Sequence, residues 1–240
     1  MIKLEHTDVY GWEAAIRGMR NPMNSWDKSD SDYRLVLGRM CDECGKYELP
    51  EEDSCDGCWI NDIPYSDSFK VGPNDHELMM RLAKGGSVHA KYRRMITVTV
   101  DITAPLYWWK EFDTYKVGTV ANSCSTMHKI HAKEFTLDDF SHEHLVDRWE
   151  PSGTWKYCLQ TVVAHLNKAR EKFLETKDKK YWHQMIQLLP TSYNQKRTIL
   201  LNYEVLVGMY RDRKNHKLNE WVDFCKWIEI LPYAEVITCG

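Results

Sequence analysis

Hydrophobic and polar positions along the chain change period several times, and each change predicts an element. The clearest strand is 95–102, where Ile96, Val98 and Val100 alternate with polar residues and so share one face of a sheet. The alternation I-K-L-E-H predicts a short strand at 2–6. A polar run at 24–32 predicts a loop, an apolar pattern resumes at 33–40, and 63–75 is interpreted as another loop.

Apolar residues at helical spacing are concentrated later in the chain. The strongest amphipathic helix is expected at 155–173. An earlier helix should begin at a Thr7 or Asp8 cap and run to about residue 19. Gly85-Gly86 should end a helix at 76–83, and Pro190 should end another at 181–189. Thr103 and Pro105 are expected to begin a helix that ends near residue 115. Apolar faces predict two more helices, at 202–213 and 218–231. Segment 135–150 is interpreted as a helix or a mobile loop. Strands early and helices late predict an α+β fold.

Length and composition suit one domain over residues 1–240 with a small insertion. Hydrophobic residues make up 43% of the chain and aromatic residues 12%, enough to fill a core. No apolar run reaches the about 18 residues of a membrane span, and M-I-K-L-E-H lacks the apolar region of a signal peptide. We therefore expect a cytoplasmic protein without a membrane partner. A net charge of -3 argues against non-specific nucleic-acid binding.

Residues 41–60 form a separate module with four cysteines in the pattern C-x2-C-x10-C-x2-C. Paired C-x-x-C turns place four thiolates around Zn²⁺, which predicts Cys41, Cys44, Cys55 and Cys58 as ligands. Four sulfurs leave no open coordination position, so the zinc would be structural. The alternatives are two redox or free-thiol pairs, or an iron–sulfur cluster. Histidines 128, 131, 142 and 144 are interpreted as surface residues rather than a second metal site.

Segment 114–127, T-Y-K-V-G-T-V-A-N-S-C-S-T-M, resembles the signature R-H-R-x-x-S-x-N-E-x-S-x-R of the flavin-dependent thymidylate synthases (ThyX type). With Ala121 as an insertion, Lys116, Thr119, Asn122 and Ser125 fall on signature positions. Two further blocks resemble the same family. They are A-A-I-R…N-P-M-N-S-W-D-K-S-D near the start, and L-P-T-S-Y-N-Q-K-R-T-I-L-L-N-Y-E-V-L-V-G-M-Y-R-D-R at 189–213. Three blocks in matching order indicate a shared fold.

The resemblance implies a homotetramer with a ThyX-like fold, a central mixed or antiparallel sheet with helices. It implies FAD, with NADPH and methylenetetrahydrofolate as co-substrates, and the reductive methylation of dUMP to dTMP. By resemblance, His89, Tyr115, Lys116 and Asn202 would contact FAD. Arg213 and Ser125 would be catalytic, and would bind dUMP or a related pyrimidine nucleotide together with Thr119 and Asn122.

Several departures from the family pattern remove charge from this expected site. Thr114, Met127 and Ile186 stand where the family has arginines, and Glu111 replaces a glutamine. Because a guanidinium pairs bidentately with phosphate, their loss weakens anion binding. Replacements could come from nearby cations, which could equally be solvated surface charges: Arg93, Arg94, Arg197, Arg211 and Lys214. The alternative function is a non-catalytic or re-purposed nucleotide- or partner-binding homologue that uses the zinc module as its interaction surface.

Overall fold

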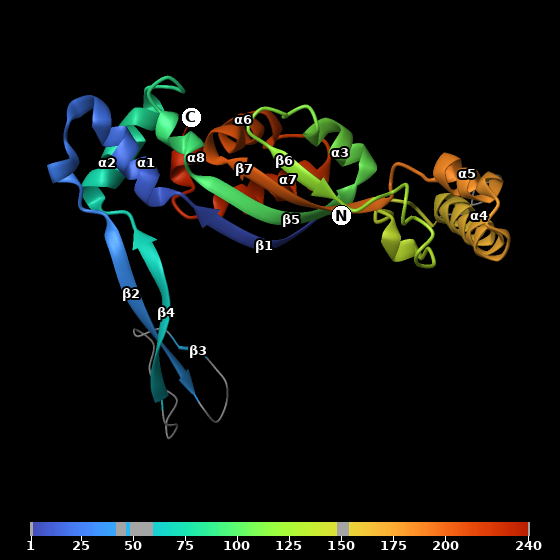
Figure 1. The fold of residues 1–240 in the computed structure, drawn as a ribbon. Helices are drawn as coiled ribbons and strands as arrows, with labels where there is room; N and C mark the ends of the chain where they lie inside the picture. Colours follow the sequence, from blue (N-terminus) through green and yellow to red (C-terminus); the bar gives the residue numbers. More distant parts are fainter. Residues whose placement is uncertain (1, 42–46, 49–59, 148–153, 240) are drawn as a thin grey trace. The chain divides into compact units, whose positions relative to one another are not determined.

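The computed structural model describes residues 2–41, 47–48, 60–147 and 154–239, with the backbone alone in the described parts of 34–68. The chain divides into two compact units (Figure 1). Unit 1 comprises Met1–Tyr10 and Ile96–Gly240, and unit 2 comprises Gly11–Met95. Within the described ranges, no helix has the length and apolar character needed to cross a membrane.

Unit 1 is built on a four-stranded antiparallel sheet in the order β1-β5-β7-β6 (Figure 1). Its strands are β1 (Lys3–Tyr10), β5 (Thr97–Pro105), β6 (Val120–Ser123) and β7 (Asn194–Asn202). In β5, Val98, Val100 and Ile102 are fully buried while the residues between them are half-buried. The alternation therefore confirms the strand expected at 95–102, and the antiparallel sheet confirms the α+β class.

Four helices complete the core behind this sheet: α3 (Leu106–Phe112), α6 (Tyr203–Arg213), α7 (Asn219–Glu229) and α8 (Glu235–Thr238). The contact between α3 and α7 is largely aromatic. The Trp108 ring of α3 lies 4.7 Å from the Trp221 ring and 5.7 Å from the Phe224 ring of α7, centre to centre. Such rings bury a large apolar area and prefer offset or edge-on geometry, which fixes α3 against α7.

Unit 1 also contains a pair of helices, α4 (Trp155–Thr176) and α5 (Lys179–Leu188) (Figure 1). This pair has its own hydrophobic core. Leu159, Val163 and Leu166 lie at helical spacing on one buried face of α4. They pack with Phe135, Phe140 and Met185. The described part of 135–150 contains a short 3-10 helix, η4 (Leu137–Asp139), and a β-bridge between Phe140 and Tyr193, rather than the longer helix considered from the sequence.

Among its described residues, unit 2 contains two α-helices, three short 3-10 helices (labelled η) and a three-stranded antiparallel sheet in the order β3-β2-β4. Its elements are α1 (Trp12–Arg20), η1 (Asn21–Met23), η2 (Trp26–Lys28), β2 (Asp32–Cys41), β3 (Tyr47–Glu48), β4 (Ile60–Lys70), α2 (Pro73–Lys84) and η3 (Lys91–Arg94). The loop expected at 63–75 was therefore wrong over most of its length. Its polar sequence belongs to β4, whose partner β2 supplies the backbone hydrogen bonds.

The expected start of the first helix was also wrong. Strand β1 continues past an irregularity between Glu5 and Asp8, where His6 has a φ of 52°. Gly11, with a φ of 90°, then redirects the chain so that α1 begins at Trp12. Similarly, Thr103 does not cap a helix, because it lies within β5 and pairs with Lys196.

Most of the predicted zinc module lies outside the described residues, including Cys44, Cys55 and Cys58. Cys41 is the last residue of β2, and its backbone is paired with Ile60 at the start of β4. The two ends of the module are thus brought together by a strand pair. Among the described residues, no group of three or more His, Cys, Asp or Glu could hold a metal ion.

Candidate functional site

The C-terminal end of α6 meets the end of α3 at Arg213. The Nε of Arg213 donates to the Tyr115 hydroxyl at 2.9 Å, and its Nη1 donates to Glu111 Oε2 at 2.7 Å. The guanidinium carbon lies 4.8 Å from the ring centre of Trp221, within cation–π range. With 19% of its side chain exposed, Arg213 is fixed in orientation and still reaches the surface.

The Glu111 carboxylate is the second centre of this cluster. Its Oε2 also accepts a hydrogen bond from Trp221 Nε1 at 3.0 Å and lies 3.5 Å from His216 Nε2. Glu111 keeps 35% of its side chain exposed. The positive charge of Arg213 is therefore balanced by a carboxylate, and an anion or a nucleobase approaching Arg213 must compete with Glu111.

The turn that follows Tyr115 carries Lys116 and Thr119 beside a cavity of about 260 Å³. Phe112, Asp113 and Ala121 complete its lining. The Thr119 hydroxyl donates to the Tyr115 carbonyl at 2.7 Å, which closes the turn. Lys116 is exposed and has no ion pair within the described part of the chain. It is therefore a free cation at the edge of this cavity.

Asn202 lies next to this turn, at the start of α6. Its side-chain oxygen caps the helix by accepting a hydrogen bond from the Val205 backbone N–H at 3.0 Å. Gly118 has a φ of 80°, and a Cβ added there would lie only 3.0 Å from Asn202 Nδ2. The turn thus needs glycine for its backbone conformation and for its close packing. The structure brings the predicted residues Lys116, Thr119 and Asn202 into one neighbourhood.

Asn122 and Ser125 lie farther along the same segment. Asn122 is exposed on β6, opposite Thr198 of β7. The Ser125 hydroxyl oxygen accepts from the backbone N–H groups of Met127, at 3.2 Å, and His128, at 2.9 Å. Ser125 lines a cavity of about 530 Å³ with Cys124, Lys129, Lys133, Asp139, Tyr193 and Lys196 among others. It therefore belongs to a different cavity from Lys116 and Thr119.

His89 belongs to unit 2, in the turn that follows α2. It is exposed, and its backbone N–H donates to the Gly86 carbonyl at 3.0 Å. Its ring packs close to Gly85, since a Cβ added at that glycine would lie 3.2 Å from the ring. Its contact with FAD stays a prediction.

Two of the side chains that depart from the family pattern serve local structure here. The Thr114 hydroxyl donates to the Glu111 carbonyl at 2.7 Å. At Met127 only the backbone carbonyl takes part, accepting from Trp182 Nε1 at 3.0 Å, and the side chain is exposed. Ile186 packs against the core of α4 and α5. Among the considered replacements, Arg197 is held by Asp113 at 2.7 Å and lies over the Trp109 ring at 4.1 Å.

Two members of the Arg213 cluster were missed at the sequence level. Trp221 was assigned only to the apolar face of the last long helix, and His216 was not considered. The sequence offered one indication of this cluster, which was the negative charge of Glu111 where the family has a neutral glutamine. A carboxylate added near a site arginine suggests an ion pair. The two hydrogen-bond partners of Arg213, Tyr115 and Glu111, lie 98 and 102 positions away along the chain.

No protein-family model and no curated protein matches this sequence. Solved structures do match. Two of them are structures of the flavin-dependent thymidylate synthase ThyX from Helicobacter pylori with FAD and dUMP, each 15% identical to this chain. The first covers 98% of this chain and 95% of its own, at a TM-score of 0.61. The second covers 98% of this chain and 94% of its own, at a TM-score of 0.60. The chain has the fold of the flavin-dependent thymidylate synthases. A UMP/dUMP methylase, PolB from Streptomyces cacaoi bound with 5-Br dUMP, is 13% identical over 100% of this chain and 95% of its own, at a TM-score of 0.55.

Proposed function

We propose that this protein is an enzyme that modifies a pyrimidine nucleotide, by reductive methylation of dUMP to dTMP with methylenetetrahydrofolate. The observation that carries the proposal is Arg213, oriented by Tyr115 and Trp221 beside the turn that holds Lys116. Structural neighbours with this fold bind dUMP or its 5-bromo analogue. A guanidinium held over an aromatic ring offers a planar set of donors suited to the edge of a uracil base.

The residues around the smaller cavity fit part of an FAD molecule. Lys116 can pair with a phosphate, and Thr119 and Asn202 offer polar side chains beside it. We include Tyr115 and His89 as further FAD contacts, and a homotetramer as the assembly that completes the site. Bound FAD would supply the hydride transfer, with NADPH as the reductant, while the protein binds and orients.

In this proposal Arg213 stabilises the negative charge that develops on the uracil ring during the reaction. A preorganised donor at such a position is worth roughly 10²–10³ in rate. Ser125, Asn122 and Thr119 would hold the rest of the nucleotide. Since Glu111 occupies one hydrogen-bonding edge of the guanidinium, at Nη1, nucleotide binding would weaken or replace the Arg213–Glu111 contact.

Two measurements on the purified protein test the reaction. We expect a flavin absorption spectrum, either as isolated or after saturation with FAD, and release of tritium from C5-labelled dUMP when methylenetetrahydrofolate and NADPH are present. Protein that binds neither FAD nor dUMP would contradict the proposal.

A second candidate is a non-catalytic homologue that binds a nucleotide or a partner on the same fold. It is favoured by the carboxylate of Glu111, which neutralises Arg213, and by the structural use of the Thr114 and Ile186 side chains. The outcome that selects this candidate is saturable dUMP binding without flavin binding and without tritium release.

We also propose a structural zinc site formed by Cys41, Cys44, Cys55 and Cys58. The pairing of Cys41 with Ile60 supports it, because β2 and β4 hold the ends of the cysteine module together. Cysteines that bind zinc rather than form disulfides suit a reducing compartment, in keeping with the cytoplasmic location that we propose. Elemental analysis should find about one zinc per chain, because four cysteine ligands complete the coordination of one Zn²⁺ ion. Replacing Cys41 and Cys44 by Ser should remove the metal, whereas metal-free protein of unchanged stability would contradict the site.

A further inference from the structure

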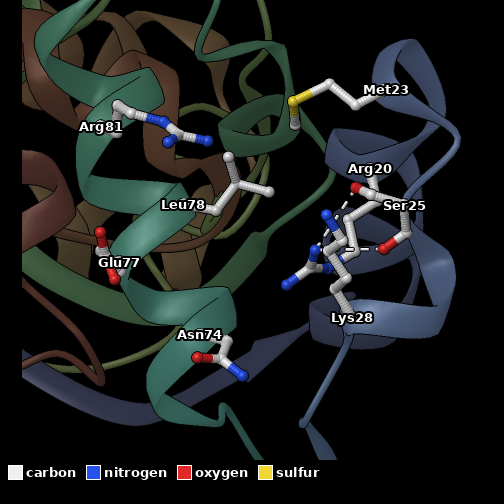
Figure 2. Close-up of a pocket in the computed structure, with 8 residues that line it drawn as sticks. All are labelled: Arg20, Met23, Ser25, Lys28, Asn74, Glu77, Leu78 and Arg81. Carbon is white, nitrogen blue, oxygen red and sulfur yellow. Dashed lines mark hydrogen bonds between the residues drawn. The ribbon is translucent and has the colours of Figure 1, made fainter.

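A second basic cavity lies entirely within unit 2, between α2 and the turns that follow α1 (Figure 2). One wall comes from α2, where Asn74, Leu78 and Arg81 are spaced so that they share a helix face. The opposite wall carries Arg20, Met23, Ser25 and Lys28. The cavity measures about 430 Å³, a size typical of sites for small molecules.

The wall opposite α2 is held in place by a buried ion pair. Arg20 is 4% exposed, and its Nε lies 2.5 Å from Asp75 Oδ1. Its Nη1 donates to the Ser25 carbonyl at 3.1 Å, as the dashed lines in Figure 2 show. The second oxygen of Asp75 accepts hydrogen bonds from Ser29 and Ser31. The segment that carries Ser25 and Lys28 is therefore fixed against α2 before any ligand arrives.

The free charge of this cavity comes from Lys28 and Arg81. Both are exposed, and neither has an ion pair among the residues that the structure describes. In Figure 2 the Arg81 guanidinium points from α2 toward the opposite wall, whereas the Glu77 carboxylate points away from that wall. Glu77 also lines the cavity. Because Asp75 already balances Arg20, the other charged side chains of the lining are the cations Lys28 and Arg81 and the single carboxylate of Glu77, so the charge beside the cavity is positive on balance.

The first backbone amides of α2 do not contribute to this attraction. The N–H groups of Asn74 and Asp75 donate to the Asp30 carboxylate at 2.9 and 3.1 Å. Asp30 thus already occupies the helix N-terminus. Anion binding in the cavity depends on its side chains instead.

We propose that this cavity binds the phosphate group of a small phosphorylated organic molecule. Arg81 offers a planar fork of donors that matches phosphate, and Lys28 adds a mobile point charge. Leu78, which is buried, and Met23, which is half exposed, place apolar surface beside these cations for the organic part of the ligand. The site is separate from the Arg213 cluster, which belongs to unit 1, and does not depend on the function proposed there.

Calorimetric titration of the full-length chain tests this site with two probes, inorganic phosphate and phenyl phosphate. We expect saturable binding of one phosphate per chain, with phenyl phosphate bound more tightly because its ring contacts Leu78 and Met23. Arg81→Gln should weaken binding about tenfold, or about 1.4 kcal/mol, and Lys28→Gln should weaken it less. Lys84→Gln, which removes an exposed cation of α2 outside the cavity, is the matched control and should bind as wild type does.

Three outcomes would overturn the proposal. Wild-type protein without saturable binding, or Arg81→Gln binding as tightly as Lys84→Gln, would remove the site. Equal affinity for the two probes would assign the site to free phosphate and reject the organic ligand. Because Arg81 and Lys28 are exposed, the variants should melt at the wild-type temperature, which separates lost binding from lost folding.

Discussion

The two units each contain an arginine paired with a carboxylate, and the pairs differ in access to water. The side chains of Arg20 and Asp75 in unit 2 are 5% and 0% exposed. Those of Arg213 and Glu111 in unit 1 are 19% and 35% exposed. Asp75 is surrounded by serine hydroxyls and backbone N–H groups, whereas Arg213 lies over the aromatic rings of Tyr115 and Trp221.

This difference separates a structural ion pair from one that a ligand can open. A buried charge without its partner is strongly unfavourable, so the Arg20–Asp75 pair must stay intact for unit 2 to keep its structure. A half-exposed pair contributes little to stability, since water competes with each partner. In the function proposed above, the Arg213 guanidinium would exchange Glu111 for a nucleotide at low cost, while the aromatic rings keep its orientation.

The largest effect should come from breaking the buried pair. Asp75→Asn leaves the Arg20 guanidinium buried without a counter-charge and should destabilise the protein by about 3–5 kcal/mol. Urea or thermal unfolding measures the change. Asp223→Asn breaks an exposed pair with Lys226 and should stay within about 0.5 kcal/mol of wild type. Equal effects of the two substitutions would contradict the distinction between the pairs.

Arg213→Lys should affect activity rather than stability. Lysine keeps the charge but loses the fork that contacts Tyr115 and Glu111 together, so dTMP formation should fall by roughly 10²–10³. The free energy of unfolding should change by no more than about 1 kcal/mol, as for a half-exposed pair. Arg211→Lys, on the same helix with an exposed partner in Asp212, is the control. Loss of stability in proportion to activity would mark Arg213 as structural.

Glu111→Gln should sharpen the comparison in the opposite direction. The amide keeps the shape and can still accept from Trp221, but it no longer neutralises Arg213. We expect dUMP to bind up to about tenfold more tightly, or about 1.4 kcal/mol. Equilibrium binding of dUMP measures this change. Weaker binding would mean that Glu111 itself contacts the nucleotide.

The comparison also predicts a change of stability with pH that arises from Asp75. Burial alone would raise its pKa, but hydrogen bonds from Ser31, Ser29 and Arg20 outweigh burial and lower it below its ordinary 3.8. The unfolded chain then takes up the proton first, so this contribution is fully present above the unfolded pKa and is lost as pH falls through the folded pKa. Unfolding measured from pH 5 downward should show the stability gap between wild type and Asp75→Asn closing with acid. A gap that stays constant would contradict this origin.

Much of the fold was accessible from periodicity, and the failures have local causes. Strand β5 and helix α4 were found because their apolar positions repeat without interruption. Strand β7 was missed because Leu200 places an apolar residue on the exposed face between buried Ile199 and Leu201, which hides the alternation. Strand β6 was missed because all four of its residues are exposed at the sheet edge.

The site was accessible only in part. The family-like segment 114–127 indicated Lys116, and the block 189–213 indicated Asn202 and Arg213; the structure places Lys116 and Asn202 beside one turn. The pairing of Arg213 with Glu111 and Trp221 depends on how α3, α6 and α7 pack, which no local pattern encodes. The Arg20–Asp75 pair likewise joins residues that are 55 positions apart.

The central claim is that Arg213 is oriented to bind a pyrimidine nucleotide in exchange for Glu111. Calorimetric titration with dUMP in the presence of FAD tests this claim most directly. Wild type and Arg211→Lys should bind dUMP saturably with equal affinity. Arg213→Lys should bind at least about tenfold more weakly, or about 1.4 kcal/mol, while melting at the wild-type temperature. Unchanged dUMP affinity in Arg213→Lys, or no saturable binding by wild type, would contradict the claim.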